Sequence, residues 1–148
     1  RRAVNASRRC LMRNRFDLLN DIFDWCVADE EIMRMLGVTD NTNTDVLKNK
    51  LRLECQADEA VTATEVPFIA YYFTRAEKLE HNWLVNKGEL YVDIYADALS
   101  EAGRLSKRFR QLLSGHDEIL LSSEGQQSIS ADGVCKYRLI YNPLIDGK

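Results

Sequence analysis

The stretch from Phe68 to Leu113 constrains the fold more than any other part of the sequence. It opens with an apolar run at residues 68–73 and continues, after a polar connection, with an alternating run at residues 89–95. From Ala98 to Leu113, apolar residues recur every three to four positions. A period of two predicts strands, and a period of about 3.6 predicts a helix. We therefore expect a strand, a long connection, a second strand and an amphipathic helix that returns over the sheet.

The two faces of the second strand carry different residues. Its aliphatic face holds Leu90, Val92 and Ile94, and we expect this face to lie beneath the helix. Its other face carries Tyr91, Asp93 and Tyr95. Aromatic rings and a carboxylate are an unusual set for a plain solvent face, so we predict that these side chains are exposed for contact with a partner.

The connection between the two strands predicts a long hairpin whose arms extend beyond the sheet. Polar residues at 77–82 mark its tip, and Asn86-Lys87-Gly88 is a turn signal. We assign partner contacts to this hairpin and to one aromatic residue of the first helix. The candidate residues are Glu77, Lys78, Glu80 and Trp83 of the hairpin, and Trp25.

The residues before this unit predict helices. Residues 8–28 form an apolar stripe typical of a helix, and Leu18 and Trp25 lie off that stripe, where they would meet a second element or another subunit. The stripe consists of Leu11, Met12, Phe16, Leu19, Ile22, Phe23 and Cys26. Asp29 is placed to cap a second, short helix that Gly37 ends. Residues 46–54 fit either an edge strand or a helical turn.

The residues after the unit predict a further strand near the end of the chain. Residues 119–121 are a candidate short strand, and the polar residues 122–133 predict a loop. Residues 134–141 alternate again, and Asn142-Pro143 is expected to close this last strand.

These elements predict an α+β fold. It has a single, mainly antiparallel sheet with a long hairpin, flanked by N-terminal helices and by one amphipathic helix between the last strands. A length of 148 residues suits one domain. We divide the chain into an Arg-rich N-terminal arm at residues 1–15 and a single domain at residues 16–148.

Charge is unevenly distributed along the chain. The net charge is −3, which does not favour nucleic-acid binding by the protein as a whole. Six arginines precede the first acidic residue, Asp17, and they are Arg1, Arg2, Arg8, Arg9, Arg13 and Arg15. This docking arm fits either nucleic-acid phosphates or the acidic surface of a neighbouring subunit, and an arm with no partner remains a further alternative.

The sequence contains no motif of nucleotide-binding or zinc-dependent enzymes. Cys10, Cys26, Cys55 and Cys135 are far apart, which favours reduced thiols and an intracellular site of folding. No apolar run approaches the ~18 residues of a membrane-spanning helix, so no membrane association is expected.

Three residue groups loosely suggest chemistry. Glu77, Glu80 and His81 resemble metal ligands, but a charged hairpin tip is more often solvated surface. Cys135 and His116 resemble a nucleophile and base, although we expect Cys135 to face the core. For Asp93 we favour a carboxylate paired with Arg or Lys over a catalytic group. We therefore expect neither an enzyme nor a cofactor or metal.

The order and spacing of the structural motifs resemble the tail terminator (tail completion, neck) proteins of tailed bacteriophages. The resemblance covers residues 16–145, and the Arg-rich arm departs from it. It is carried by residues 66–73 and 89–96, by the helix that ends in Leu112-Leu113, by the strand near Tyr137, and by residues 29–37 with Lys48-Asn49-Lys50.

The resemblance implies a structural virion protein, assembled in the host cytoplasm, with no catalytic residues. Members of the family form a hexameric ring that caps the finished tail tube and ends its polymerisation. The implied partners are further copies of the chain, the tail tube protein and the head–tail connector proteins, with sheet edges or hairpins joining neighbours. DNA only passes through the lumen, and a net-negative body suits such a channel.

Other functions remain open from the sequence. A head–tail joining protein of the neck would share the same motifs. A protein-binding domain outside phage would use the sheet face for a partner, and an enzyme would use a site around Asp93 and its neighbouring tyrosines.

Overall fold

The computed structural model describes residues 14–79, 82–116 and 119–146, and only the backbone of residues 75–79, 82–87 and 146. In chain order the elements are α2 (Arg15–Ala28), α3 (Glu30–Met35), α4 (Thr44–Lys50), β1 (Leu51–Arg52), the 3-10 turn η1 (Asp58–Ala60), β2 (Phe68–Leu79), β3 (Asn82–Ala96), α5 (Leu99–Leu113), β4 (Leu121–Gln127), β5 (Cys135–Tyr141) and β6 (Leu144–Asp146).

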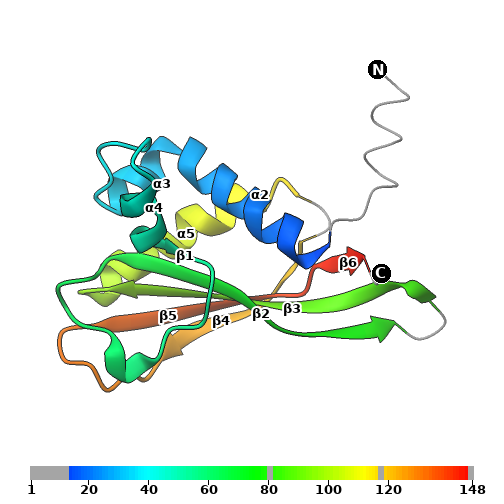
Figure 1. The fold of residues 1–148 in the computed structure, drawn as a ribbon. Coiled ribbons are helices and arrows are strands. Elements are labelled where there is room, and N and C mark those ends of the chain that lie inside the picture. The colour runs from blue at the N-terminus through cyan, green and yellow to red at the C-terminus, as the bar shows by residue number, and fades with distance from the viewer. Residues whose placement is uncertain (1–13, 80–81, 117–118, 147–148) are drawn as a thin grey trace.

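The α+β fold class is confirmed. The strands form one sheet in the order β1-β2-β3-β5-β4, and β6 pairs with β3. Every pairing is antiparallel except the short one between β1 and β2. The helices cover one face of the sheet, and the segment with η1 crosses the opposite face (Figure 1).

The main core lies between the sheet and the helices, as the periodicity of α5 predicts. Leu90, Val92 and Ile94 are fully buried and face the apolar side of α5, which includes Leu105 and Phe109. The opposite face of the sheet has a second, smaller core. Its members are Val61, Phe68, Ala70, Tyr95 and Val134.

The long hairpin is confirmed, but its turn signal was misinterpreted. Asn86, Lys87 and Gly88 lie inside β3 and pair with Lys78, Glu77 and Ala76 of β2. Gly88 is needed for close approach, because a Cβ at this position would lie 2.8 Å from Cε1 of Phe73.

The prediction of a loop at residues 122–133 was wrong for its first half. Residues Leu121–Gln127 form β4, which pairs with β5. An edge strand with exposed sides does not need alternating apolar residues, so its sequence looks like a loop. Asn142-Pro143 closes β5 as predicted, but β5 is not the last strand, because β6 follows and pairs with β3.

The buried face of α2 also differs from the predicted stripe. Leu18, Ile22 and Cys26 recur every four residues and are buried, whereas Phe16 is 68% exposed. The described helix begins at Arg15 because the Asn14 side chain accepts a hydrogen bond from the amide of Asp17. The predicted helical residues 8–13 lie outside the described residues.

The predicted start and end signals of α3 are confirmed. The Asp29 side chain caps α3 by accepting a hydrogen bond from the amide of Ile32, and Gly37 follows the helix with φ of +74°. The ambiguous segment at residues 46–54 contains both alternatives, because α4 runs directly into β1.

Candidate interaction surfaces of the sheet

Asp93 is the centre of a hydrogen-bonded network on the face of the sheet opposite the helices. Its side chain is fully buried, and Arg138 Nε donates to Oδ1 at 2.7 Å. The hydroxyl of Tyr72 donates to Oδ2 at 2.7 Å. Both carboxylate oxygens therefore have partners from neighbouring strands, which confirms the expected pairing of this carboxylate with an arginine.

A second ion pair joins the loop before β2 to the sheet. Lys136 Nζ lies 2.9 Å from Oδ1 of Asp58 and 3.7 Å from Oδ2 of Asp93. The hydroxyl of Tyr95 donates to the same Asp58 oxygen at 3.1 Å. The ring of Tyr95 stacks on Phe68 with centroids 4.6 Å apart. These contacts fix the η1 segment over one end of the sheet.

The expected exposure of Asp93 and Tyr95 was therefore wrong. Both residues have 0% exposed surface. Tyr95 belongs to the smaller core and contacts Asp58 of η1, whereas Asp93 is enclosed by Arg138, Tyr72 and Lys136. Alternation showed which face these residues occupy. It did not show that a loop folds over that face, so neither side chain reaches a partner directly in this fold.

The network holds its hydroxyl groups in the protonated state. Burial raises the pKa of Tyr72, and the hydrogen bond to Asp93 raises it further. The hydrogen bond to Asp93 also raises the pKa of Arg138. A permanently charged guanidinium that uses two donors on one carboxylate gives a structural link between β3 and β5. It leaves neither oxygen of Asp93 free to accept a proton from a substrate.

Tyr91 is the member of the predicted face that stays partly exposed. Arg138 lies over its ring, with Cζ 4.5 Å from the centroid, and Tyr72 lies beside it with centroids 5.9 Å apart. Together with Ile140, these residues form a partly exposed aromatic and cationic patch beyond the η1 segment. This patch is the accessible part of the face that the sequence singled out.

Trp25 lies on α2, away from Tyr91 and the hairpin. Its ring stacks on His116, with centroids 3.7 Å apart and an interplanar angle of 11°. The side chain is partly buried against the main core. Trp25 therefore has an internal packing role, and the predicted partner patch does not form one continuous surface.

The remaining predicted contact residues are only partly described. The backbones of Glu77 and Lys78 lie in β2, and that of Trp83 lies in β3, whereas Glu80 lies outside the described residues. Arg15 is the exposed first residue of α2. The other arginines of the arm, Arg1, Arg2, Arg8, Arg9 and Arg13, lie outside the described residues.

The two edges of the sheet are candidate interaction sites, and the sequence did not show which strands form them. β1 pairs with only Ile69 and Ala70, so no described strand covers the outer edge of β2 from Tyr71 onward. β4 ends the sheet on the other side, again without a further strand among the described residues. Unpaired edges offer rows of backbone donors and acceptors to another chain.

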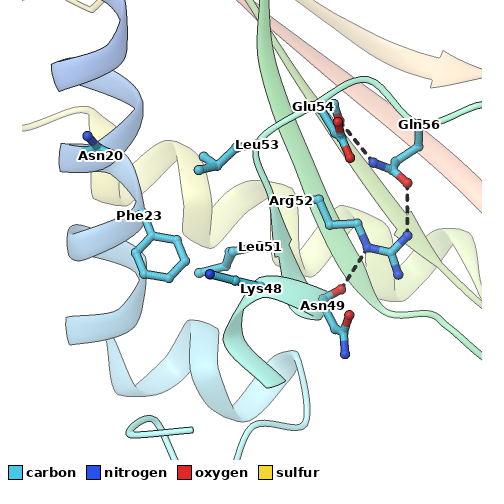
Figure 2. Close-up of a pocket in the computed structure, with 9 residues that line it drawn as sticks. All are labelled: Asn20, Phe23, Lys48, Asn49, Leu51, Arg52, Leu53, Glu54 and Gln56. Atoms are coloured by element: carbon cyan, nitrogen blue, oxygen red, sulfur yellow. Dashed lines mark hydrogen bonds between the residues drawn. The ribbon is translucent and has the colours of Figure 1, made fainter. Parts of the chain in front are cut away.

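A groove of about 610 Å³ lies beside the first of these edges, between α2 and the segment around β1 (Figure 2). Phe23, Leu51 and Leu53 form its apolar lining. Arg52 fixes the far wall by donating from Nε to the carbonyl of Asn49 at 2.9 Å and from Nη1 to Oε1 of Gln56 at 3.1 Å. The groove is therefore a formed feature with one apolar and one polar side.

Of the groups considered for chemistry, Glu80 and His81 lie outside the described residues, and only the backbone of Glu77 is described. Cys26, Cys55 and Cys135 are free thiols, and burial raises the pKa of Cys26. The alternation predicts that Cys135 faces the core, and this is wrong, because Cys135 is only half-buried. Within residues 14–79, 82–116 and 119–146, no His, Cys, Asp and Glu side chains form a metal-binding group. No helix in these ranges is long and apolar enough to cross a membrane.

Comparison with known proteins adds a likeness of fold. No protein-family model matches the chain, and no curated protein matches its sequence. Among solved structures, it is similar to a chain from a structure titled "Virion of native gene transfer agent (GTA) particle", with a TM-score of 0.58 and 8% sequence identity. The match covers 85% of this chain and 92% of that chain. The two chains thus share one fold over nearly their whole lengths.

Proposed function

We propose that the protein is a structural component of a virion, built to assemble with copies of itself and with other virion proteins. The observation that carries this proposal is the fold shared with a chain of a virion particle, since the match includes nearly all of both chains. The free edges of the sheet support it, because they suit assembly with other chains.

Within that class, the role we propose is the cap of a tail tube. The chain would form a ring, six copies in the proposed form, that ends tube polymerisation and joins the tail to the head connector. The order of sequence motifs supports this finer role. The two free edges of the sheet are unlike each other, and a ring needs two different complementary surfaces on each subunit.

We further propose that the role is not enzymatic. The most suggestive carboxylate, Asp93, is fully buried and has both oxygens engaged by Arg138 and Tyr72. A general base needs an oxygen within hydrogen-bond reach of its substrate.

We propose that DNA only passes through the lumen of the ring and is not bound there. The chain has a net charge of −3, which does not favour binding to phosphates.

The test has two parts. Negative-stain microscopy and light scattering of the purified chain should reveal closed rings, and a stable monomer would contradict the proposal. The matching tail tube protein should stop growing when rings are added, so its tubes should have a narrower length distribution. Rings that bind the connector but leave tube growth unchanged would assign the chain to head–tail joining instead.

A further inference from the structure

We infer that β4 of one copy pairs antiparallel with the outer edge of β2 in the next copy, and that its Leu121 packs against Phe16 on α2. The inference rests on the proposed self-assembly and specifies the two surfaces that meet. It follows from the strand directions, from the few protecting features of β4, and from apolar residues that lie on the same side of the sheet at both edges.

Strand direction makes the two edges compatible. β2 is antiparallel to β3, β3 to β5, and β5 to β4. β4 therefore runs opposite to β2, and a second copy in the same orientation brings its β4 antiparallel to the free part of β2. The two surfaces differ, so the contact is head-to-tail, and its repetition closes a ring or extends a filament.

β4 has few of the features that usually protect an edge strand, apart from a register shift between Leu121 and Ser123 in its ladder with β5. It spans the seven residues Leu121–Gln127, and Glu124 is their only charged residue. The strand contains no proline or lysine, which commonly block edge pairing. Glu124 itself is occupied within the chain, because its Oε2 lies 2.8 Å from Nη1 of Arg110 and its Oε1 accepts from Tyr137.

Exposed apolar side chains lie on the helix side of both edges. Leu121 is 39% exposed and pairs in register with Tyr141, which faces the main core, so Leu121 points to the helix side. At the other edge, Phe16 is 68% exposed. Phe16 lies four and seven residues before Asn20 and Phe23, which line the groove, and therefore occupies the groove side of α2.

The direction of α2 brings these two residues to the same end of the contact. In Figure 1, α2 begins above the middle of the long hairpin and runs away from the hairpin tip, opposite to β2. An incoming antiparallel β4 also starts at the tip side of β2. Because β4 runs in the same direction as α2, its first residue, Leu121, and Phe16 in the first turn of α2 lie at the same end of the contact.

The experiment uses two single variants of the full chain, Phe16→Asp and Leu121→Asp. Both side chains are exposed in an isolated subunit, so each variant should fold and keep the circular dichroism spectrum of the wild type. Burying a carboxylate in the contact should weaken self-association at least about 100-fold, leaving particles of 17.0 kDa in light scattering. Leu99→Asp is the matched control, because Leu99 is 47% exposed but lies on α5. It should assemble like the wild type.

Mixing the two variants tests the head-to-tail geometry. Each variant keeps one intact surface, so an equimolar mixture should form a heterodimer although neither variant assembles alone. If the wild type forms rings and both variants also assemble, this inference is overturned, but the proposed function is not. Loss of assembly in Leu121→Asp alone, without an effect of Phe16→Asp, would point to a twofold contact between β4 strands and overturn it. A monomeric wild type would overturn both proposals.

Discussion

At the scale of single residues, the buried polar network decides how the second face of the sheet is used. Asp93 faces the two cations Arg138 and Lys136, whose side chains are 21% and 6% exposed. A buried charge that loses its partner lowers the stability of the folded state, so these charges stabilise the fold only as a pair. The network therefore acts as a structural brace that ties β2, β3, β5 and the η1 segment together.

Replacing Asp93 by asparagine should reveal this bracing role. The Asp93→Asn change leaves Arg138 without its countercharge, so the free energy of unfolding in urea should fall by about 3 kcal/mol. Asp132→Asn, at an exposed turn residue, should change it by less than about 0.5 kcal/mol. Equal stabilities would refute the brace. An Asp93→Asn chain that still assembles would also remove catalysis as the reason for this carboxylate.

The sequence suggests a turn at Gly88, whereas in the structure the close packing of Phe73 explains why this position is glycine. Gly88→Ala should destabilise the fold by about 1–3 kcal/mol, because the new methyl group collides with the ring of Phe73 and approaches the carbonyl of Pro143 at 3.3 Å. Gly125→Ala in β4 is the matched control, since no atom lies within 4 Å of its Cβ position. Thermal unfolding of both variants checks the difference, and similar melting temperatures would contradict the close approach.

At the scale of elements, Asp29 lies between α2 and α3 and links them to α5, the helix that covers the sheet. Its carboxylate caps α3, and Arg108 of α5 donates from Nε to its Oδ1 at 3.3 Å. Burial alone would raise the pKa of Asp29, but the hydrogen bonds from Arg108 and from the α3 backbone outweigh it and lower the pKa. A lowered pKa means that the ionised carboxylate stabilises the folded state.

Two substitutions separate the cap from the ion pair. Asp29→Asn keeps a capping oxygen and loses the charge, so it should cost about 1 kcal/mol at neutral pH. Asp29→Ala loses both interactions and should cost about 1 kcal/mol more. Because the folded pKa is lowered, the ionic contribution is present above the unfolded pKa of about 4 and is lost as pH falls through the folded pKa. The Asp-to-Asn difference in urea unfolding should therefore shrink toward acid pH, and a constant difference would rule out the charge as its cause.

At the scale of the whole molecule, the described domain and the Arg-rich arm should be separable. Asn14 caps α2, so a deletion of residues 1–13 preserves the described helix, whereas a deletion through Arg15 would remove its cap. The deletion removes five arginines and no acidic residue. It should leave the melting temperature within about 2 °C of the full chain and should weaken docking to an acidic virion neighbour, measured by co-sedimentation. Unchanged docking would show that the arm is not an interaction element.

How much the sequence predicted follows from where each residue lies in the fold. The periods of β3 and α5 were correct because those elements form the main core, where burial selects every second or every third to fourth residue. β4 was missed because an edge strand is under no such selection. The candidate site was predicted only in part. The pairing of Asp93 was foreseen from charge, but the burial of Tyr95 depends on Val61 and Val134, which are distant in sequence.

By itself, the sequence determined the local structure and the side-chain faces of this protein: the long hairpin, the helix that follows it, the cap at Asp29, and a second sheet face with Tyr91, Asp93 and Tyr95. Hydrogen bonding and periodic burial act over a few neighbouring residues, so they are visible in sequence. The tertiary structure alone decided which of these side chains stay accessible and which sheet edges stay free. Exposure depends on what distant segments cover. Asp58 of η1 contacts Tyr95 and the smaller core buries it, whereas no described strand covers β4.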